Sequence, residues 1–316
     1  MRLSRFPTSD YAFKLVAAAL AASALVILLL MGYTLLSSSI PVLKRFGLYF
    51  FTGTKWNSAA GKEIYGALPY MLGTLVTSAI ALIIGVPISL GIAIFLSEMS
   101  PRGIRIPVSN LVELLAAVPS VIYGLWGFFV FRFFIADYIE TPLSTYFGWI
   151  PIFSGPPIGV DVLTAGCILA IMIIPTVSSV SREVISAVPN SVREGAYSIG
   201  ATRWEVTRNW VLGYARSGLF GAVILGLGRA VGETIAVSMV IGNTIGPSAL
   251  PTSLLKPGQT MSSLILNLFF EATPGTQEFS AILGVGLFLM VLAFSINIIA
   301  RLMVTRVLKV KGGAIE

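Results

Sequence analysis

Arg229 and Glu233 are the residues of this 316-residue chain whose types and spacing most directly suggest chemistry. They stand four positions apart in the string GRAVGET (228–234), inside a long apolar stretch. On a continuous helix this spacing puts both side chains on one face. Charges at membrane depth are costly, and they usually face the interior of a helix bundle or an aqueous path. The pattern therefore predicts a buried ion pair with a functional role.

A guanidinium group suits an oxyanion such as phosphate, because it stays charged and presents a planar fork of donors. We assign Arg229, Glu233 and Thr234 to a substrate path on this basis. Glu233 would neutralise Arg229 when no anion is present and would keep anion binding weak enough for release. The alternative is a structural pair that only locks this helix against a neighbour, because buried pairs can serve packing specificity alone.

Enzyme chemistry has few candidate residues here. Histidine is absent and Cys167 is the one cysteine, which excludes disulfides, Cys/His metal sites and histidine-based catalysis within the chain. The phosphate-binding loop pattern of nucleotide-binding proteins is also missing, since the Gly61-Lys62 pair is followed by Glu63. We predict no catalytic residue, metal site or bound cofactor on this chain. If ATP and Mg are used, another chain binds them.

The elements that must position Arg229 are membrane helices. Hydrophobic residues make up 56% of the chain and charged residues 11%, with a mean hydropathy of +0.89, whereas a soluble domain is about one-quarter charged. We predict an all-α polytopic membrane protein with about six spans. The spans are 15–36, 72–96, 114–131, 162–181, 217–242 and 279–300. The first is too long for a secretory signal and no A-x-A site follows it, so we interpret it as a retained helix.

The distribution of basic residues predicts the orientation, because cytoplasmic flanks carry the excess of Lys and Arg. One side holds Arg2, Arg5, Lys14, Arg102, Arg105, Arg182, Arg193, Arg203, Arg208, Arg216, Arg301, Arg306, Lys309 and Lys311. The other holds Lys44, Arg45, Lys55, Lys62, Arg132 and Lys256. Both termini are therefore predicted to be cytoplasmic. The net charge of +7 follows from this orientation and does not require a nucleic-acid partner.

Prolines and glycines in the spans predict kinks and close helix packing. Pro87, Pro119 and Pro175 fall in the second, third and fourth spans, and we favour packing kinks over gating hinges for them. The pairs Gly228/Gly232 and Gly242/Gly246 have the spacing that lets helix backbones approach closely. Between the third and fourth spans, the aromatic and proline-rich stretch 138–161 is predicted to be an outer loop at the membrane interface. A docking surface for an external partner is its alternative function.

The cytoplasmic connection 182–216 contains signals for two short helices joined by a turn. Ser191 and Glu194 have capping-box spacing, Gly200 is a helix stop, and Thr202 and Glu205 form a second capping-box pattern. A projecting helix-turn-helix suits insertion into a groove on a partner protein. The alternative is a solvated connector in which both glutamates only cap helices.

This connection resembles the "EAA" coupling loop of ABC importer permeases. The pattern of that loop is EAA, three residues, Gly, nine residues and I-x-L-P; the chain has EGAYSIG (194–200), then nine residues and WVLG (210–213). Glu194, Ala196, Gly200 and Leu212 match the pattern, whereas Gly195, Trp210 and Gly213 depart from it. The resemblance implies that Ser191, Glu194, Ala196, Gly200, Thr202 and Glu205 form the segment that contacts an ATPase.

A second resemblance covers the chain from about the second span to the sixth. The string GLGRAVGETIAV (226–237), with Gly242-Asn243, resembles the phosphate-specific subclass of these permeases, in which the arginine and glutamate are associated with transport. Further strings, YGALP (65–69), IFLSE (94–98) and PSVIYG (119–124), resemble the PstC type in particular. The resemblance implies a type I ABC importer permease fold.

The resemblance also implies the partners of the chain. These are a similar second permease of the PstA type, an ATPase dimer that binds ATP and Mg, and an extracytoplasmic phosphate-binding protein. We predict a permease subunit for inorganic phosphate import in the cytoplasmic (inner) membrane. Its regions would be a cytoplasmic segment 1–14, a permease domain 15–306 and a cytoplasmic tail 307–316. The alternatives are an ion-coupled secondary transporter in which Glu233 titrates, an ABC permease for sulfate or molybdate, and a subunit that only relays phosphate status.

Overall fold

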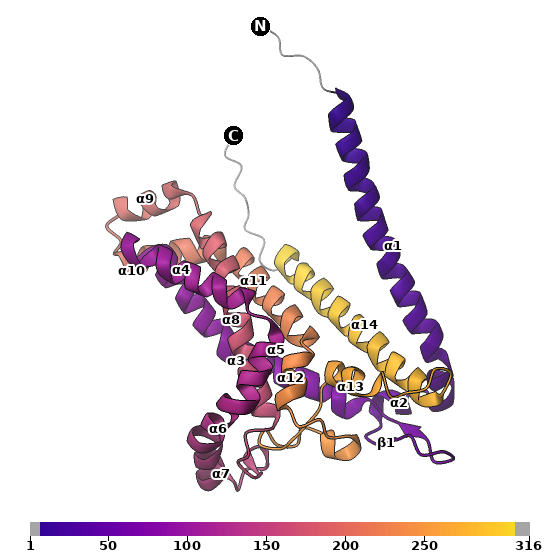
Figure 1. Cartoon of the computed structure of the whole chain (residues 1–316). Coiled ribbons are helices and arrows are strands. Elements are labelled where there is room, and N and C mark those ends of the chain that lie inside the picture. Colours follow the sequence, from indigo (N-terminus) through magenta and orange to yellow (C-terminus); the bar gives the residue numbers. More distant parts are fainter. Residues whose placement is uncertain (1–6, 307–316) are drawn as a thin grey trace.

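The computed structural model describes residues 7–306, which are almost entirely helical (Figure 1). The described part contains 6 candidate spans: Ala12–Phe46, Leu68–Met99, Ser120–Phe147, Val162–Ser186, Arg203–Gly232 and Gln277–Met303. The all-α class and the expected number of spans are therefore confirmed. The predicted tail 307–316 and the first six residues of the predicted N-terminal segment lie outside the described residues, and with them Arg2, Arg5, Lys309 and Lys311.

Short elements join or extend the spans. In chain order the elements are α1 (Pro7–Phe46), α2 (Tyr49–Thr52), β1 (Trp56–Asn57), β2 (Ile64–Tyr65), α3 (Leu68–Ile94), η1 (Phe95–Met99), α4 (Arg102–Ala117), α5 (Ser120–Trp126), η2 (Gly127–Phe131), α6 (Arg132–Ile135), η3 (Ala136–Glu140), α7 (Thr141–Phe147), η4 (Pro151–Phe153), α8 (Val162–Ser186), α9 (Asn190–Ser198), α10 (Arg203–Glu205), η5 (Val206–Val211), α11 (Leu212–Gly232), α12 (Ile235–Val240), η6 (Gly246–Ala249), α13 (Met261–Leu268) and α14 (Gln277–Arg306). The two short strands pair antiparallel.

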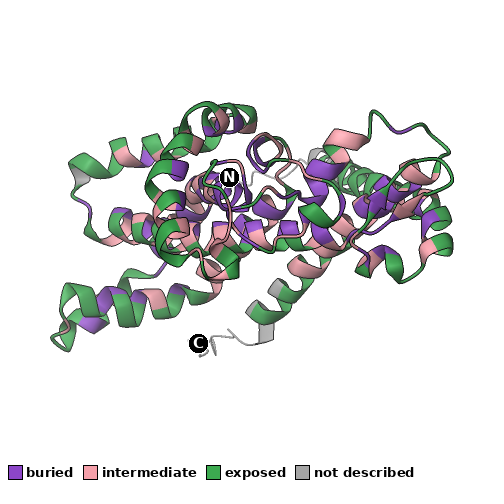
Figure 2. Ribbon diagram, turned by 90° about the horizontal axis from the view of Figure 1, so that it is seen from below, coloured by how far each residue is buried: buried purple, intermediate pink, exposed green. Residues whose placement is uncertain are grey.

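Helix α8 is the centre of the bundle and packs most closely against α3. Glycines allow this approach: a Cβ atom added to Gly85 of α3 would lie 2.8 Å from Ile173 Cγ1, and one added to Gly166 of α8 would lie 2.6 Å from Ile80 Cγ2. Small residues of this kind let membrane helices gain van der Waals contact along their length. One cluster of buried residues lies along these two helices and α11, and Figure 2 shows buried residues in purple.

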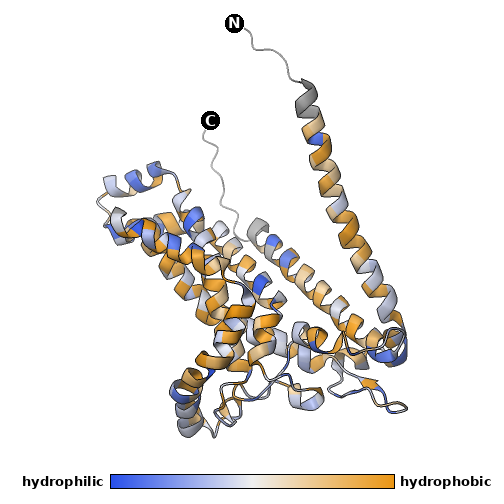
Figure 3. Ribbon diagram, in the orientation of Figure 1, coloured by the Kyte–Doolittle hydropathy of each residue, from blue (hydrophilic) through white to orange (hydrophobic). Residues whose placement is uncertain are grey.

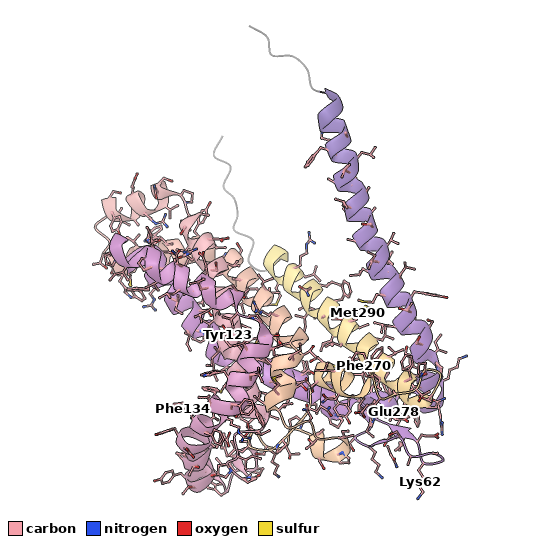
Figure 4. All side chains as sticks on the ribbon, viewed as in Figure 1. Lys62, Tyr123, Phe134, Phe270, Glu278 and Met290 are labelled. Carbon is pink, nitrogen blue, oxygen red and sulfur yellow. The ribbon has the colours of Figure 1, made fainter. Side chains whose placement is uncertain are left out.

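Helices α1 and α14 form the outer edge of the bundle. Their contact includes Gly32 of α1, where an added Cβ would lie 3.4 Å from Met290 Cε of α14, and Figure 4 labels Met290 on the yellow helix. The most hydrophobic window of α1 has none of its residues buried, although Figure 3 shows this helix to be mostly hydrophobic. An exposed helix that is apolar on all sides is suited to a lipid environment.

The third predicted span, 114–131, is wrong in its limits. Helix α4 ends at Ala117, Val118 and Pro119 are extended, and a new helical run begins at Ser120. The ring of Pro119 disfavours helical angles at Val118, and the Tyr123 hydroxyl donates to the Leu115 carbonyl (2.8 Å) beside the break. Figure 4 labels Tyr123 at this point. Pro119 therefore separates two helices, whereas Pro87 and Pro175 lie inside α3 and α8 as predicted.

Two further predictions need correction. The outer loop predicted for 138–161 begins too early, because the helical run continues through α7 to Phe147. The Gly242/Gly246 pair lies on no α-helix, because Gly242 follows the end of α12 and Gly246 begins the short 3₁₀ turn η6, with φ angles of 94° and 73°. These positive angles make a turn, in which the spacing cannot form a helix-packing face.

Candidate functional site

Arg229 lies near the end of α11 and reaches across to α8. Its Nη1 donates a hydrogen bond to Thr176 Oγ1 over 2.8 Å. Thr176 follows Pro175 within α8, so the central helix supplies this acceptor. The arginine is partly buried where α8 and α11 pack together.

Glu233 does not share a helix with Arg229, contrary to the prediction from their spacing. Helix α11 ends at Gly232, and Glu233 has extended backbone angles (φ −69°, ψ 128°) before α12 begins at Ile235. Within residues 7–306 no ion pair joins Arg229 to Glu233. The break is stabilised by Ser262, whose hydroxyl donates to the Glu233 carbonyl (2.8 Å), and the Glu233 carboxylate accepts the Ala236 N–H at 3.5 Å.

Thr234 lies within this break and lines a groove. The groove walls are Thr234 and Ser262 together with Ile265, Leu266, Phe269, Phe270 and Leu289. The structure therefore places Thr234 at an accessible surface between α12, α13 and α14. Arg229 does not line this groove, so Arg229 and Thr234 face different surroundings.

The Arg229 guanidinium keeps most of its donors for another partner. Among the described residues its side chain has Thr176 as its only hydrogen-bond acceptor, whereas a guanidinium offers five N–H groups. The helix face beside it is also open, because a Cβ added to Gly228 or Gly232 would meet nothing within 4 Å. A partly exposed, unneutralised guanidinium of this kind can bind an oxyanion.

The predicted turn of the cytoplasmic connection is confirmed. Gly200 has a φ angle of 84°, and the N–H groups of Gly200 and Ala201 donate to the carbonyls of Tyr197 (3.0 Å) and Ala196 (3.3 Å). This hydrogen-bond pattern closes a helix at a left-handed residue. Thr202 then starts α10 with a complete capping box, in which its hydroxyl and N–H both bond to Glu205.

The first predicted capping box, at Ser191 and Glu194, is wrong. Helix α9 begins at Asn190 with Pro189 as its N-cap, and no side chain caps it. Ser191 is the second residue inside the helix, so its hydroxyl does not hold the capping position, and Pro189 has no side-chain acceptor. Ser191 and Glu194 are exposed, whereas Ala196 is buried against Ile185, Val188 and Val211. An exposed groove between α9 and α11 is lined by residues that include Ser191, Ile199, Trp210 and Tyr214.

Two sets of contacts were not predicted from the sequence. The first is Thr176, whose only signal was its position after Pro175. The second is an ion pair between Glu98 of η1, the turn that continues α3, and Arg193 of α9, with Arg193 Nη2 2.7 Å from Glu98 Oε1. The IFLSE string contains Glu98 and the predicted cytoplasmic basic residues include Arg193, but no spacing in the sequence indicates that the two meet.

A buried acid pair joins the third span, which carries Glu140, to the start of the fourth, where Asp161 is the N-cap of α8. Glu140 accepts the Gly159 N–H (2.9 Å) and the Thr164 hydroxyl (3.2 Å), while Asp161 Oδ1 caps α8 by accepting the Thr164 N–H (2.8 Å). Both carboxyl groups are fully buried, and Asp161 Oδ2 has no protein partner among the described residues. Burial, and then the neighbouring Glu140, raises the pKa of Asp161 to about 8. The acid pair therefore binds a proton more readily than two separate carboxyl groups would.

The chain is similar to known membrane-transport proteins. The family described as "Binding-protein-dependent transport system inner membrane component" matches residues 85–309. The chain belongs to this family. This permease is a multi-pass inner-membrane protein and a transport subunit. Residues 85–309 include α8, the cytoplasmic connection and α11, which together carry the Thr176–Arg229 contact and the capped turn.

Curated relatives of this permease cover nearly its whole length. It is 46% identical over 308 residues to a "Phosphate transport system permease protein PstC" of Xylella fastidiosa, covering 96% of this chain and 93% of that protein. It is 46% identical over 296 residues to a protein of the same name from Haemophilus influenzae, covering 92% of each. A more distant relative, "Probable phosphate transport system permease protein PstC" of Methanocaldococcus jannaschii, is 36% identical and covers 83% of each chain. The resemblance to PstC-type permeases is confirmed.

Solved structures support the fold alone. The permease is similar to a chain of a bacterial ABC transporter involved in the import of the acidic polysaccharide alginate, with a TM-score of 0.57, 17% identity, and coverage of 95% of this chain and 99% of that one. It is also similar to a chain of the inward-facing MetNI methionine ABC transporter, with a TM-score of 0.53, 16% identity, and coverage of 77% and 94%. The expected ABC importer permease fold is confirmed.

Proposed function

We propose that this permease carries inorganic phosphate across the inner membrane as one half of an ATP-driven import channel. The proposed substrate rests on the 46% identity, over 96% of the chain, to a phosphate transport permease. The chemistry at Arg229 supports it, because a guanidinium with donors to spare suits a tetrahedral oxyanion. Phosphate would meet Arg229 as it crosses. Glu233, unpaired with the arginine, would supply a repelling charge that favours release, and Thr234 would line the path beyond it.

The channel needs a second permease, which we propose to be a homologous PstA-type subunit. The open face of α11 supports this partner. A Cβ added to Gly221, Gly228 or Gly232 would meet nothing within 4 Å, and small residues at such a face allow close packing of another membrane helix. The Arg229 guanidinium would then lie beside the subunit interface.

The energy source would be an ATPase dimer that binds ATP and Mg on separate chains, with no cofactor bound by this permease. The capped α9–α10 element, with Ser191, Glu194, Gly200, Thr202 and Glu205 at its surface, would contact that dimer. ATP binding would close the ATPases and move the α9–α10 element. The cavity around Arg229 would switch from outward to inward access. An extracytoplasmic phosphate-binding protein would deliver the anion to the opposite side.

The cytoplasmic side would be the side of α9 and α10, with both chain ends on it. Figure 1 supports this orientation, because the first turns of α1 and the last turns of α14 lie toward the same side of the bundle as α9 and α10. A tag fused after Lys311 should be labelled only when cells are permeabilised. Labelling of that tag in sealed cells would overturn the orientation.

Reconstitution tests the whole proposal. The copurified complex, in proteoliposomes with the phosphate-binding protein, should take up radiolabelled phosphate only when ATP is supplied on the ATPase side. Omission of the ATPase should abolish uptake, whereas an ion-coupled transporter would retain it under an ion gradient. Excess sulfate or molybdate should not compete. Competition by either anion would assign the permease to the corresponding oxyanion, and ATP-dependent signalling without uptake would assign it to phosphate sensing.

A further inference from the structure

Three arginines from later segments form hydrogen bonds to the last turn of the second span. Helix α3 continues into the π-helical turn η1, Phe95–Met99, and π-helical turns occur frequently at functional sites. Arg105 of α4 donates to the carbonyls of Leu96 (2.6 Å) and Ser97. Arg203 of α10 donates to the carbonyl of Glu98. Cations suit this position, because the carbonyls that end a helix carry partial negative charge.

Arg193 makes the most extensive of these contacts. Its Nη2 and Nε lie 2.7 and 3.3 Å from Glu98 Oε1. Two further bonds reach the end of α8 and the connection after it, where the carbonyls of Ile185 and Val188 accept from Nη2 (3.0 Å) and Nη1 (2.6 Å), and a longer one joins Nη1 to Asn190 Oδ1 of α9 (3.5 Å). One side chain on α9 therefore holds the cytoplasmic ends of α3 and α8 together.

The burial of this pair distinguishes it from an ordinary surface ion pair. The side chains of Arg193 and Glu98 are 18% and 11% exposed, so solvent screens their attraction much less than at a fully exposed site. Charge-assisted hydrogen bonds of this geometry are also about twice as strong as neutral ones. The α9 helix is thus fixed to α3 by a directional contact.

Helices α3 and α8 both pack against α11, the helix that bears Arg229. Helix α3 also packs along α8. Thr176, which holds Arg229, belongs to α8. A displacement of α9 that shifts the ends of α3 and α8 would therefore change the position of Thr176 and the side-chain contacts of Arg229.

We propose that the Glu98–Arg193 pair is the link through which movement of the α9–α10 element reaches α3 and α8. This inference rests on the proposed function, because it assumes that a nucleotide-binding partner moves that element. Glu98 and Arg193 are positioning residues: they contact neither the transported anion nor ATP, and they act through the helices that carry the path.

The chain offers a matched control in a second cytoplasmic ion pair. Arg182 Nη2 lies 2.8 Å from Glu113 Oε1, with side chains 24% and 54% exposed. This pair joins α8 to α4 and makes no bond to residues 190–205 among the described contacts. Glu113→Gln removes the same charge as Glu98→Gln at the same side of the membrane.

The test measures phosphate transported per ATP hydrolysed by the complete transporter in proteoliposomes. In Glu98→Gln and Arg193→Lys this ratio should fall by roughly fivefold or more, the lower end of typical coupling between sites. ATP hydrolysis should continue, and Glu113→Gln should keep the parental ratio. A parental ratio in both Glu98→Gln and Arg193→Lys would overturn the inference, as would an equal loss in Glu113→Gln.

A second measurement does not depend on the transported anion. In the purified complex, a non-hydrolysable ATP analogue should change the backbone hydrogen exchange of residues 85–99 in the parental and Glu113→Gln proteins. In Glu98→Gln the change at residues 85–99 should be markedly smaller, although the Arg203 bond to the Glu98 carbonyl is kept. A full response of residues 85–99 in Glu98→Gln would refute the link. If the parental complex takes up no phosphate yet shows this exchange pattern, the proposed function fails while the link stands.

Discussion

Arg229 Nη1 of α11 donates a 2.8 Å hydrogen bond to the Thr176 hydroxyl of α8. This contact holds the guanidinium through one N–H group and leaves the others for a further acceptor. It also joins the helix that bears the charge to the most buried helix of the bundle. The position of Arg229 therefore depends on how α8 and α11 pack.

Substitutions at this contact should separate anion binding from structure. Arg229→Gln should abolish phosphate uptake while the complex still assembles, and Arg229→Lys should retain at most part of the uptake because an ammonium lacks the planar fork. Thr176→Val is the matched control, since it removes only the acceptor and should lower uptake less than Arg229→Gln does. Uptake assays and copurification measure both properties. Parental uptake by the Arg229→Met, Glu233→Leu double variant would rule out a direct role for Arg229.

Glu233→Gln should leave the assembly of the permease unchanged. Glu233 lies beyond the end of α11, and its carboxylate accepts only a long hydrogen bond, 3.5 Å from the Ala236 N–H. We expect a change in unfolding free energy of no more than about 0.5 kcal/mol, as for substitutions away from buried networks. Loss of a negative charge near the path should lower the apparent KM for phosphate and slow its release. A variant that no longer assembles would mean that Glu233 has a structural partner.

Gly200→Val should impair the cytoplasmic turn through its backbone alone. Gly200 has a φ of 84° and a Cβ added there would meet nothing within 4 Å, so the cost is that of a left-handed residue, about 1–2 kcal/mol. Uptake should fall while membrane insertion is retained. Gly195→Ala on the same element is the control, because that site is equally open and needs no positive φ. Equal uptake by both variants would identify the connection as a passive linker.

Thr202→Ala should loosen the start of α10, whereas Ser191→Ala should not affect α9. The Thr202 hydroxyl is part of a capping box, and no side chain caps α9. Loss of a cap costs about 0.5–2 kcal/mol locally. Hydrogen exchange of residues 202–206 should therefore increase in Thr202→Ala, while residues 190–194 keep the parental rate in Ser191→Ala. The reverse ranking would contradict the assigned caps.

The acid pair that joins the third and fourth spans should make stability depend on pH. The pKa of Asp161 is raised from 3.8 to about 8 in the fold, so the folded protein holds a proton that the unfolded chain has lost. The stabilisation is complete below the unfolded pKa and is lost as the pH rises through the folded pKa. Thermal unfolding in detergent should therefore occur at a lower temperature at pH 9 than at pH 5. Asp161→Asn should weaken this dependence, and an unchanged profile would assign it to another group.

The sequence by itself determined the number of spans and the position of four of them, because the hydropathy of a span is a property of its own residues. The third and fifth spans, Ser120–Phe147 and Arg203–Gly232 in the fold, differ from the predicted 114–131 and 217–242. The sequence also identified the turn at Gly200 and the cap at Thr202, since capping bonds join residues three or four positions apart. It misassigned Ser191, because the same spacing occurs where Pro189 already occupies the N-cap. Such a local pattern indicates that a helix starts nearby. The backbone angles in the fold determine the residue at which it starts.

Only the tertiary structure decided which polar groups meet. Arg229 and its acceptor are 53 positions apart, and Arg193 and Glu98 are 95 apart. The break at Glu233 is likewise fixed from a distance, because the hydroxyl that bonds to the Glu233 carbonyl comes from Ser262, 29 positions later. The residues between 228 and 234 would suit a continuous helix, but a carbonyl released from the helix is stable only where the fold supplies another donor.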